Sequence, residues 1–130
     1  KRTNENGVFR WIMADVFKRF ISNLTSTNLT TVFTVPEADV AATPPVPVST
    51  FVVKSLSVHN YDASNSVTVS IIQNNGTSDF EIDEVDVSGT DTTTRTDVKV
   101  FEGGDLLKVQ ANASNRAMVT VSLLEIKQQQ

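Results

Sequence analysis

The apolar residues of this chain follow two different spacings, one before residue 25 and another after residue 27. In the first segment they recur every three or four residues, which places them on one face of a helix. The sequence therefore predicts an amphipathic helix over residues 6–24, within an N-terminal arm of residues 1–26. Trp11 and Ile12 widen the face formed by the others, and the full set is Phe9, Trp11, Ile12, Met13, Val16, Phe17, Phe20 and Leu24.

An isolated helix of this length is only marginally stable in water, so the predicted helix needs a surface to pack against. Two interpretations follow from this requirement. In one, the apolar face covers an open side of the protein's own fold. In the other, it docks on another subunit or on a neighbouring protein, and the eight apolar residues are then the docking residues.

From Thr27 onwards apolar and polar residues alternate, which is the period of a half-buried β-strand. Turn residues separate the alternating segments, and no second helix is expected between them. Short strands at this regular spacing predict an all-β fold over residues 27–126: an antiparallel β-sandwich of seven to eight strands, jelly-roll-like or immunoglobulin-like. A frayed tail, 127–130, follows. The predicted strands are 29–35, 51–60, 67–73, 80–87, 98–101, 106–111 and 117–126.

Proline and glycine mark the breaks between these strands. All four prolines lie in residues 36–49, and because proline lacks an N–H group and fixes φ, this segment is predicted to be a loop or an extended arm. Such an arm is suited to lie over a partner. Gly103 or Gly104 is expected to take a positive φ in a tight hairpin. Between Ile82 and Val85 the alternation shifts parity, which predicts a β-bulge or a bend.

Composition and charge narrow the range of possible partners and functions. Hydrophobic residues make up 39% and charged residues 20%, which is typical of a soluble globular domain, and the absence of cysteine excludes a disulfide scaffold. The net charge of −4 is uneven, because residues 1–24 hold five basic and two acidic side chains and residues 25–130 hold six and thirteen. Such an acidic body disfavours nucleic acid and anionic lipid, so neither is an expected partner. No apolar run reaches the roughly 18 residues of a membrane span.

The sequence offers little catalytic chemistry. His59 is the only histidine, and no nucleophile and orienting group stand beside it, so we interpret it as an exposed or half-buried strand residue. Strand alternation places Asp79, Glu81 and Asp83 in one row, where they are weak candidates for calcium ligands. The glycine-punctuated loop of an EF-hand is missing, which favours a solvated outer face instead. We expect no enzymatic activity and no cofactor.

Three stretches carry a resemblance to a known family. They are an opening "TTVFTVP", a central "VVKSLSVHN" followed by "SVTVSI", and a closing "EGGDLLKVQANASNRAMVTVSLLEI". Together they resemble small virion proteins of tailed bacteriophages, over about three quarters of the chain. The resemblance implies a β-sandwich component of the particle, in capsid decoration or as a neck or tail accessory. The helical arm and the long proline-rich segment are additions to that pattern.

These observations lead to one expected function and two alternatives. The expectation is a structural component of a bacteriophage virion, a capsid decoration or cement protein attached through its N-terminal helix and arm and present as a homo-oligomer. Its partners would be the major capsid protein or other virion proteins, and its location the particle surface or the neck and tail. The first alternative is a neck, tail or fibre-base accessory protein. The more distant one is a module that binds a glycan or a protein on the host surface.

Overall fold

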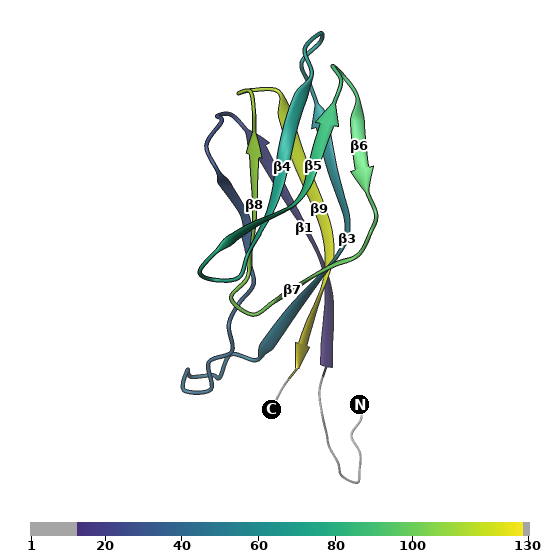
Figure 1. The fold of residues 1–130 in the computed structure, drawn as a ribbon. Coiled ribbons are helices and arrows are strands. Elements are labelled where there is room, and N and C mark those ends of the chain that lie inside the picture. The colour runs from purple at the N-terminus through teal and green to yellow at the C-terminus, as the bar shows by residue number, and fades with distance from the viewer. Residues whose placement is uncertain (1–12, 129–130) are drawn as a thin grey trace.

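The structure, a computed structural model, describes residues 13–128 and forms two antiparallel sheets packed face to face (Figure 1). The described residues contain nine strands and no helix, and therefore none long and apolar enough to cross a membrane. The strands are β1 (Met13–Leu24), β2 (Thr30–Thr34), β3 (Val48–Asn60), β4 (Val67–Asn74), β5 (Asp79–Val87), β6 (Thr92–Arg95), β7 (Lys99–Glu102), β8 (Leu106–Ala111) and β9 (Ala117–Gln128).

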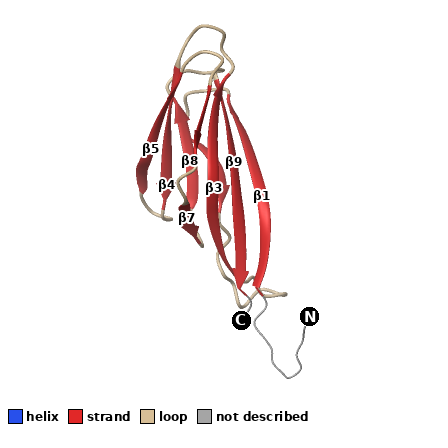
Figure 2. Cartoon of the chain, turned by 90° about the vertical axis from the view of Figure 1, so that its right-hand side faces the viewer, coloured by secondary structure: helices blue, strands red, loops and turns tan. Residues whose placement is uncertain are grey.

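The strand order places distant segments of the chain side by side. One sheet has the order β1-β9-β3-β6, with β7 also paired to β3, and the other has the order β2-β8-β4-β5. Most connections pass from one sheet to the other, which is the arrangement of a jelly roll. Figure 2 shows the two layers from the side, with β1 at the free edge of the longer layer.

The predicted sandwich is confirmed in its main features. Each of the seven predicted strands is present with small shifts of its ends, and Ile82 is the extra residue of a bulge, since Ile71 pairs with Asp83 and Ile72 with Glu81. β6 was not predicted, because its four polar residues carry no apolar alternation. Gly104 does take a positive φ of 89°, but its turn joins β7 to β8 of the other sheet and is not a hairpin.

The predicted N-terminal helix is wrong from Met13 onwards. Those residues form β1, which pairs with β9 in a continuous antiparallel register that runs to Leu24 opposite Ala117. The rest of the predicted helix, with Phe9, Trp11 and Ile12, lies outside the described residues. β1 is hydrogen-bonded into the five-stranded sheet, so these residues belong to the sandwich and not to a separate docking arm.

The apolar core lies between the two sheets. Valine, leucine and isoleucine from both layers fill most of it, and an aromatic cluster fills one part. The ring of Phe33 from β2 lies 5.5 Å from that of Phe20, 5.1 Å from that of Phe51 and 5.1 Å from that of Phe101. Three of these rings come from the five-stranded sheet, so the cluster joins the layers directly.

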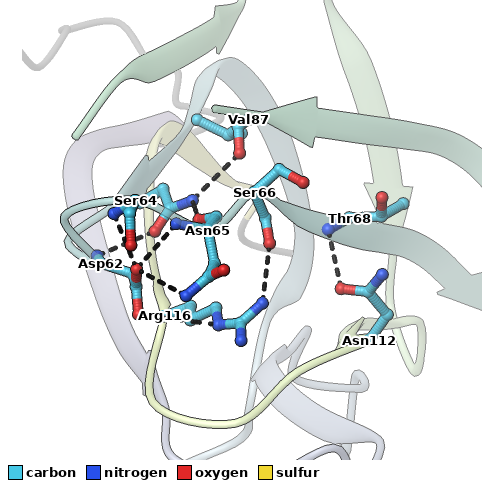
Figure 3. A network of polar contacts seen from close by, with 9 residues as sticks. Asp62, Ser64, Asn65, Ser66, Thr68, Val87, Asn112 and Arg116 are labelled. Atoms are coloured by element: carbon cyan, nitrogen blue, oxygen red, sulfur yellow. Dashed lines mark hydrogen bonds and ion pairs between the residues drawn. The ribbon is translucent and has the colours of Figure 1, made fainter. Parts of the chain in front are cut away.

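Asn60, fully buried at the end of β3, fixes the loops at one end of the sandwich. Its amide donates to the carbonyl oxygens of Asn65 (2.8 Å) and Val87 (3.0 Å), and its side-chain oxygen accepts from the Asp62 N–H. Asp62 in turn accepts from the backbone of Ser64 and Asn65 (Figure 3). These backbone hydrogen bonds hold the pKa of Asp62 below its ordinary value.

Asn60→Ala is therefore expected to destabilise the fold by about 2 to 4 kcal/mol, because it leaves the buried Val87 carbonyl and the part-buried Asn65 carbonyl without this donor. Urea unfolding followed by circular dichroism measures the change. Ser57→Ala is the matched control on the same strand, since the Ser57 hydroxyl makes only an exposed hydrogen bond to Thr94. Equal unfolding midpoints for the two variants would contradict the role given to Asn60.

Candidate functional site

The acidic row of β5 does not form a converging site. Asp79 accepts hydrogen bonds from Asn74 (2.7 Å) and Lys108 (3.1 Å), and these hold its pKa below the ordinary value. Burial opposes ionisation of Asp83, but the hydrogen bond and charge of Arg95, at 2.8 Å, outweigh it and lower the pKa of Asp83. Glu81 is exposed. Across residues 13–128 no three or more histidine, aspartate or glutamate side chains are grouped to hold a metal ion.

His59 lies on the outer face of the five-stranded sheet and bonds to a neighbouring strand. Its Nδ1 is 2.8 Å from the hydroxyl of Thr92 on β6. The nearby Ser57 is bonded to Thr94, so its hydroxyl is not directed to the imidazole. Within the described chain, this arrangement lacks the base, nucleophile and orienting group of a hydrolytic site.

The predicted docking residues separate onto both faces of β1. Leu24 is only 2% exposed and Phe20 packs against the core, so both belong to the protein's own interior. Val16 is 40% exposed on the same side of the strand, whereas Phe17, 81% exposed, points to the opposite, outer face. The described side chains of the set therefore do not form a continuous helical face, and Phe17 is the member that the outer face of β1 presents to a partner.

Phe17 is the end of an apolar row that crosses four strands. The strand registers place Phe17 beside Leu124, Leu124 beside Val52, and Val52 beside Val100. We call these four residues the apolar row. Val100 is 50% exposed, and Val98, two residues before it, is 59% exposed. Ile21 (54%) also lies on the outer side of β1, but Arg19 separates it from Phe17. Sequence analysis missed this surface, although adjacent Leu123 and Leu124 on one strand require that one of the two faces outward.

A second apolar surface lies in the proline-rich segment. Backbone hydrogen bonds in both directions join Asp39 to Val46, at 3.0 and 2.8 Å, and close the segment into an ordered loop. The loop encloses a cavity of about 400 Å³, which we call the proline pocket. It is lined by Ala38, Val40, Pro44, Pro45, Val46, Pro47 and Val48.

The proline-rich loop that forms the pocket lies at the end of the sandwich where β1 begins and β9 ends (Figure 1). The turn before β8 holds the start of the proline-rich segment in place, because Gly104 donates to the Val35 carbonyl oxygen at 2.9 Å. The positive φ of Gly104 favours glycine at this turn, and a Cβ atom there would come within 2.6 Å of the Glu37 carboxylate, so that side chain would have to move. Val40 is 76% exposed on the loop and offers an apolar contact to a partner.

The outer face of the four-stranded sheet carries a polar groove instead. Its volume is about 580 Å³, and hydroxyl, amide and carboxylate groups from several strands and loops line it. Gln110 donates to the backbone of Thr27 at 3.0 Å, which joins β8 to the β1–β2 connection. The lining residues are Thr27, Thr68, Ser70, Glu84, Gln110, Ala111 and Asn112.

An ion pair between the partly exposed Lys18 and the buried Glu125 joins β1 to β9 beside the aromatic cluster. The Lys18 ammonium lies 2.6 Å from Oε1 of Glu125, a residue with no exposed surface, and the Ser49 hydroxyl donates to Oε2 at 3.0 Å. Burial opposes the ionisation of Glu125, but Lys18 and Ser49 outweigh it, and the pKa of Glu125 lies below its ordinary value. Among the described residues, Oε1 has no hydrogen bond besides this ion pair.

Comparison with known proteins identifies the architecture. No protein-family model and no curated protein sequence match the chain. A chain in the acid-stable capsid structure of Helicobacter pylori bacteriophage KHP30 aligns with a TM-score of 0.54 and 8% identity, covering 90% of this chain and 91% of that chain. A chain of Bacillus endospore appendages, which form disulfide-linked pili, aligns with a TM-score of 0.42 and 9% identity, covering 97% of this chain and 95% of that chain. Murine APRIL aligns with a TM-score of 0.42 and 11% identity, covering 81% of this chain and 98% of that chain.

At these identities the likeness concerns the fold alone. The first alignment extends over nine-tenths of both chains, so the whole two-sheet sandwich is shared with a chain of a phage capsid structure. The same fold hosts many functions, and the role of this protein must be argued from its surfaces.

Proposed function

We propose that the protein is a non-catalytic structural component of a bacteriophage virion, and in particular a decoration or cement protein on the capsid. The observation that carries this proposal is the shared sandwich with a phage capsid chain over 90% of the sequence. The resemblance of its strand-and-turn motifs to small virion proteins supports the same assignment. A neck, tail or fibre-base position is the alternative within the same class.

We further propose that the protein attaches to the particle through the proline pocket and the adjacent start of β1. Prolines restrict the loop before binding, so less conformational entropy is lost when a partner docks on it. The pocket is apolar and Val40 projects beside it, which suits an apolar side chain of a shell protein. This replaces attachment through a helix of residues 6–24, which the strand β1 contradicts for residues 13–24.

The assignment is tested on purified particles of the phage that encodes the chain. An antibody against the protein is expected to detect it in gradient-purified virions, and electron microscopy with the labelled antibody is expected to mark the capsid surface. Labelling at the neck or tail would favour the accessory role. A protein found only in the unassembled fraction would overturn the virion assignment.

Val40→Asp is expected to weaken rebinding to particles stripped of the protein by at least tenfold, because a carboxylate would be desolvated in an apolar contact. Cosedimentation over a range of protein concentrations measures the binding. Leu29→Asp is the matched control, since Leu29 is 40% exposed in the β1–β2 connection at the opposite end of the sandwich. Equal binding by both variants would exclude the proline pocket as the attachment surface.

A host-surface glycan is a second candidate ligand, and the polar groove on the four-stranded sheet favours it. Hydroxyl, amide and carboxylate groups such as those of Ser70, Gln110 and Glu84 are the kinds that bond to sugar hydroxyls. A glycan array with the wild type and Gln110→Ala decides this candidate. Binding that the substitution abolishes would support the groove, and an array without signal would reject it.

A further inference from the structure

We propose that the outer face of the five-stranded sheet packs against the same face of a second copy, around a two-fold axis that runs along the apolar row. This inference goes beyond the proposed function and does not depend on it, because it concerns the purified chain alone. Phe17 and Val100 are exposed at the two ends of the row, Leu124 and Val52 between them are half-buried, and Val98 is exposed two residues before Val100. Contiguous apolar surface of this kind marks an interaction site.

Cations lie on one side of the row and anions on the other, and this arrangement indicates which partner fits the face. One step along the strands, about 7 Å to one side of the row, lie the cations Arg19 and Lys54. One step to the other side lie the anions Asp15 and Glu102. All four side chains are exposed. Opposite charges thus flank the row on its two sides.

This pattern is complementary to itself in one orientation. Rotation by 180° about the row exchanges its two sides, so Arg19 of one copy faces Asp15 of the other, and each contact occurs twice. Rotation about an axis parallel to the strands instead sets Asp15 opposite Glu102, and that like-charge contact is unfavourable. The charges therefore select the axis along the row and a second copy as the occupant.

The available area is sufficient for a stable pair. β1 and β9 have 12 residues each and β3 has 13, which gives a length of about 40 Å. Four neighbouring strands span about 19 Å. Phe17 has four residues before it in β1, so rotation about the row overlaps about nine residues of each long strand, about 30 Å, and roughly 570 Å² of each copy. The two copies together bury about 1,100 Å², just above the ~1,000 Å² expected of a specific interface. Sheets that pack face to face lie about 10 Å apart, within reach of an arginine and an aspartate side chain.

Phe17→Asp is the first test, with the full chain studied by analytical ultracentrifugation at micromolar concentrations. The wild type is expected to be a dimer, and the variant to dissociate with a Kd raised by about 100-fold or more. The symmetric interface loses both aromatic side chains, which face each other across the axis, and gains two carboxylates there. Phe80→Asp, at an aromatic residue 53% exposed on β5 of the other sheet, is the control and is expected to remain dimeric. Unchanged thermal unfolding of monomeric Phe17→Asp would show that the fold is intact, and Val100→Glu provides an independent second variant.

A charge exchange tests the axis itself. Asp15→Arg and Arg19→Asp are each expected to weaken the dimer at least tenfold, and the double variant to restore the Kd to within about threefold. A monomeric wild type, a closed trimer or larger ring, or a dimer insensitive to both Phe17→Asp and Val100→Glu would overturn the proposal. Single variants that weaken the dimer without rescue in the double variant would overturn the axis along the row.

Discussion

A chain that begins at residue 25 is expected to lose cooperative folding. It lacks β1, and with it Leu24 from the core, Phe20 from the aromatic cluster and the ammonium group that neutralises Glu125. Removal of two large core side chains costs several kcal/mol. The twelve paired residues of β9 would also become an open edge, which favours aggregation. Near-ultraviolet circular dichroism and thermal unfolding would show the loss of fixed tertiary packing.

The control for this truncation begins at Met13 and retains the whole described sandwich. It is expected to unfold in one cooperative transition like the full chain. If the chain that begins at residue 25 unfolded in the same way, β1 would be dispensable and a separate N-terminal docking arm would be restored. The truncation also limits what a particle-binding experiment can prove, because loss of binding by an unfolded chain says nothing about attachment.

Lys18→Met is expected to destabilise the protein by about 1 to 3 kcal/mol at neutral pH, because it leaves the buried Glu125 carboxylate without its counter-ion. The Lys18 side chain is 37% exposed, so solvent screens part of the interaction. Methionine retains the length and apolar character of the side chain, which lies against Phe51, so the change acts mainly on the charge. Chemical unfolding at pH 7 measures the loss. A variant as stable as the wild type would show that water or backbone groups solvate the carboxylate.

The pH dependence of this variant has the opposite sign to that of the wild type. In the wild type the pKa of Glu125 lies below its ordinary 4.5, so its stabilising contribution is present above pH 4.5 and is lost as the pH falls through the lower folded-state pKa. Without Lys18, burial is expected to raise the pKa of Glu125 above the ordinary value. The deficit of Lys18→Met should therefore shrink as the pH falls through the raised pKa towards 4.5. Unfolding curves between pH 7 and pH 4 measure this trend.

A double variant separates the ion pair from the surrounding packing. Lys18→Met combined with Glu125→Leu removes both charges and is expected to recover most of the stability lost by the single change. It should also lose the pH dependence that the carboxylate produces. A double variant that is no more stable than Lys18→Met would mean that the lost contact is packing and not charge.

The two-sheet fold could be predicted because most strands are apolar on one face only. In β4, Val67, Val69 and Ile71 face the core and alternate with residues directed to solvent, so a period of two is visible in the sequence. Turn chemistry was equally informative, since Gly76 in the β4–β5 turn has the positive φ of 99° that its Asn-Gly pair indicates.

β1 could not be predicted in the same way, because it is apolar on both faces. Phe20 and Leu24 point into the core while Phe17 and Ile21 point out, and together they imitate the spacing of a helix. The interior position of Lys18 weakens the strand period further. Large apolar side chains on the outer side of this edge strand explain why the spacing predicted a helix. The same side chains form part of the candidate interface.

The candidate surfaces depend on pairings between residues far apart in the chain. Phe17 and Leu124 are neighbours only because the last strand lies beside the first, and Val100 joins them through β3. The proline-rich loop was predicted from composition, whereas its cavity depends on the bridge between Asp39 and Val46. Long-range pairing of this kind is not encoded in any local period.

The start of β1 and the end of β9 lie at the same end of the sandwich as the proline-rich loop (Figure 1). A fluorescent protein or cargo enzyme fused after β9 would therefore project from that end, where its bulk crowds the loop. The β1–β2 connection, residues 25–29, lies at the other end and is the better insertion point for an epitope or a displayed peptide. One end of the sandwich is thus crowded by the proline-rich loop and the other is accessible. In a display scaffold built on this chain, the displayed peptide would be inserted in the β1–β2 connection and not fused to an end of the chain.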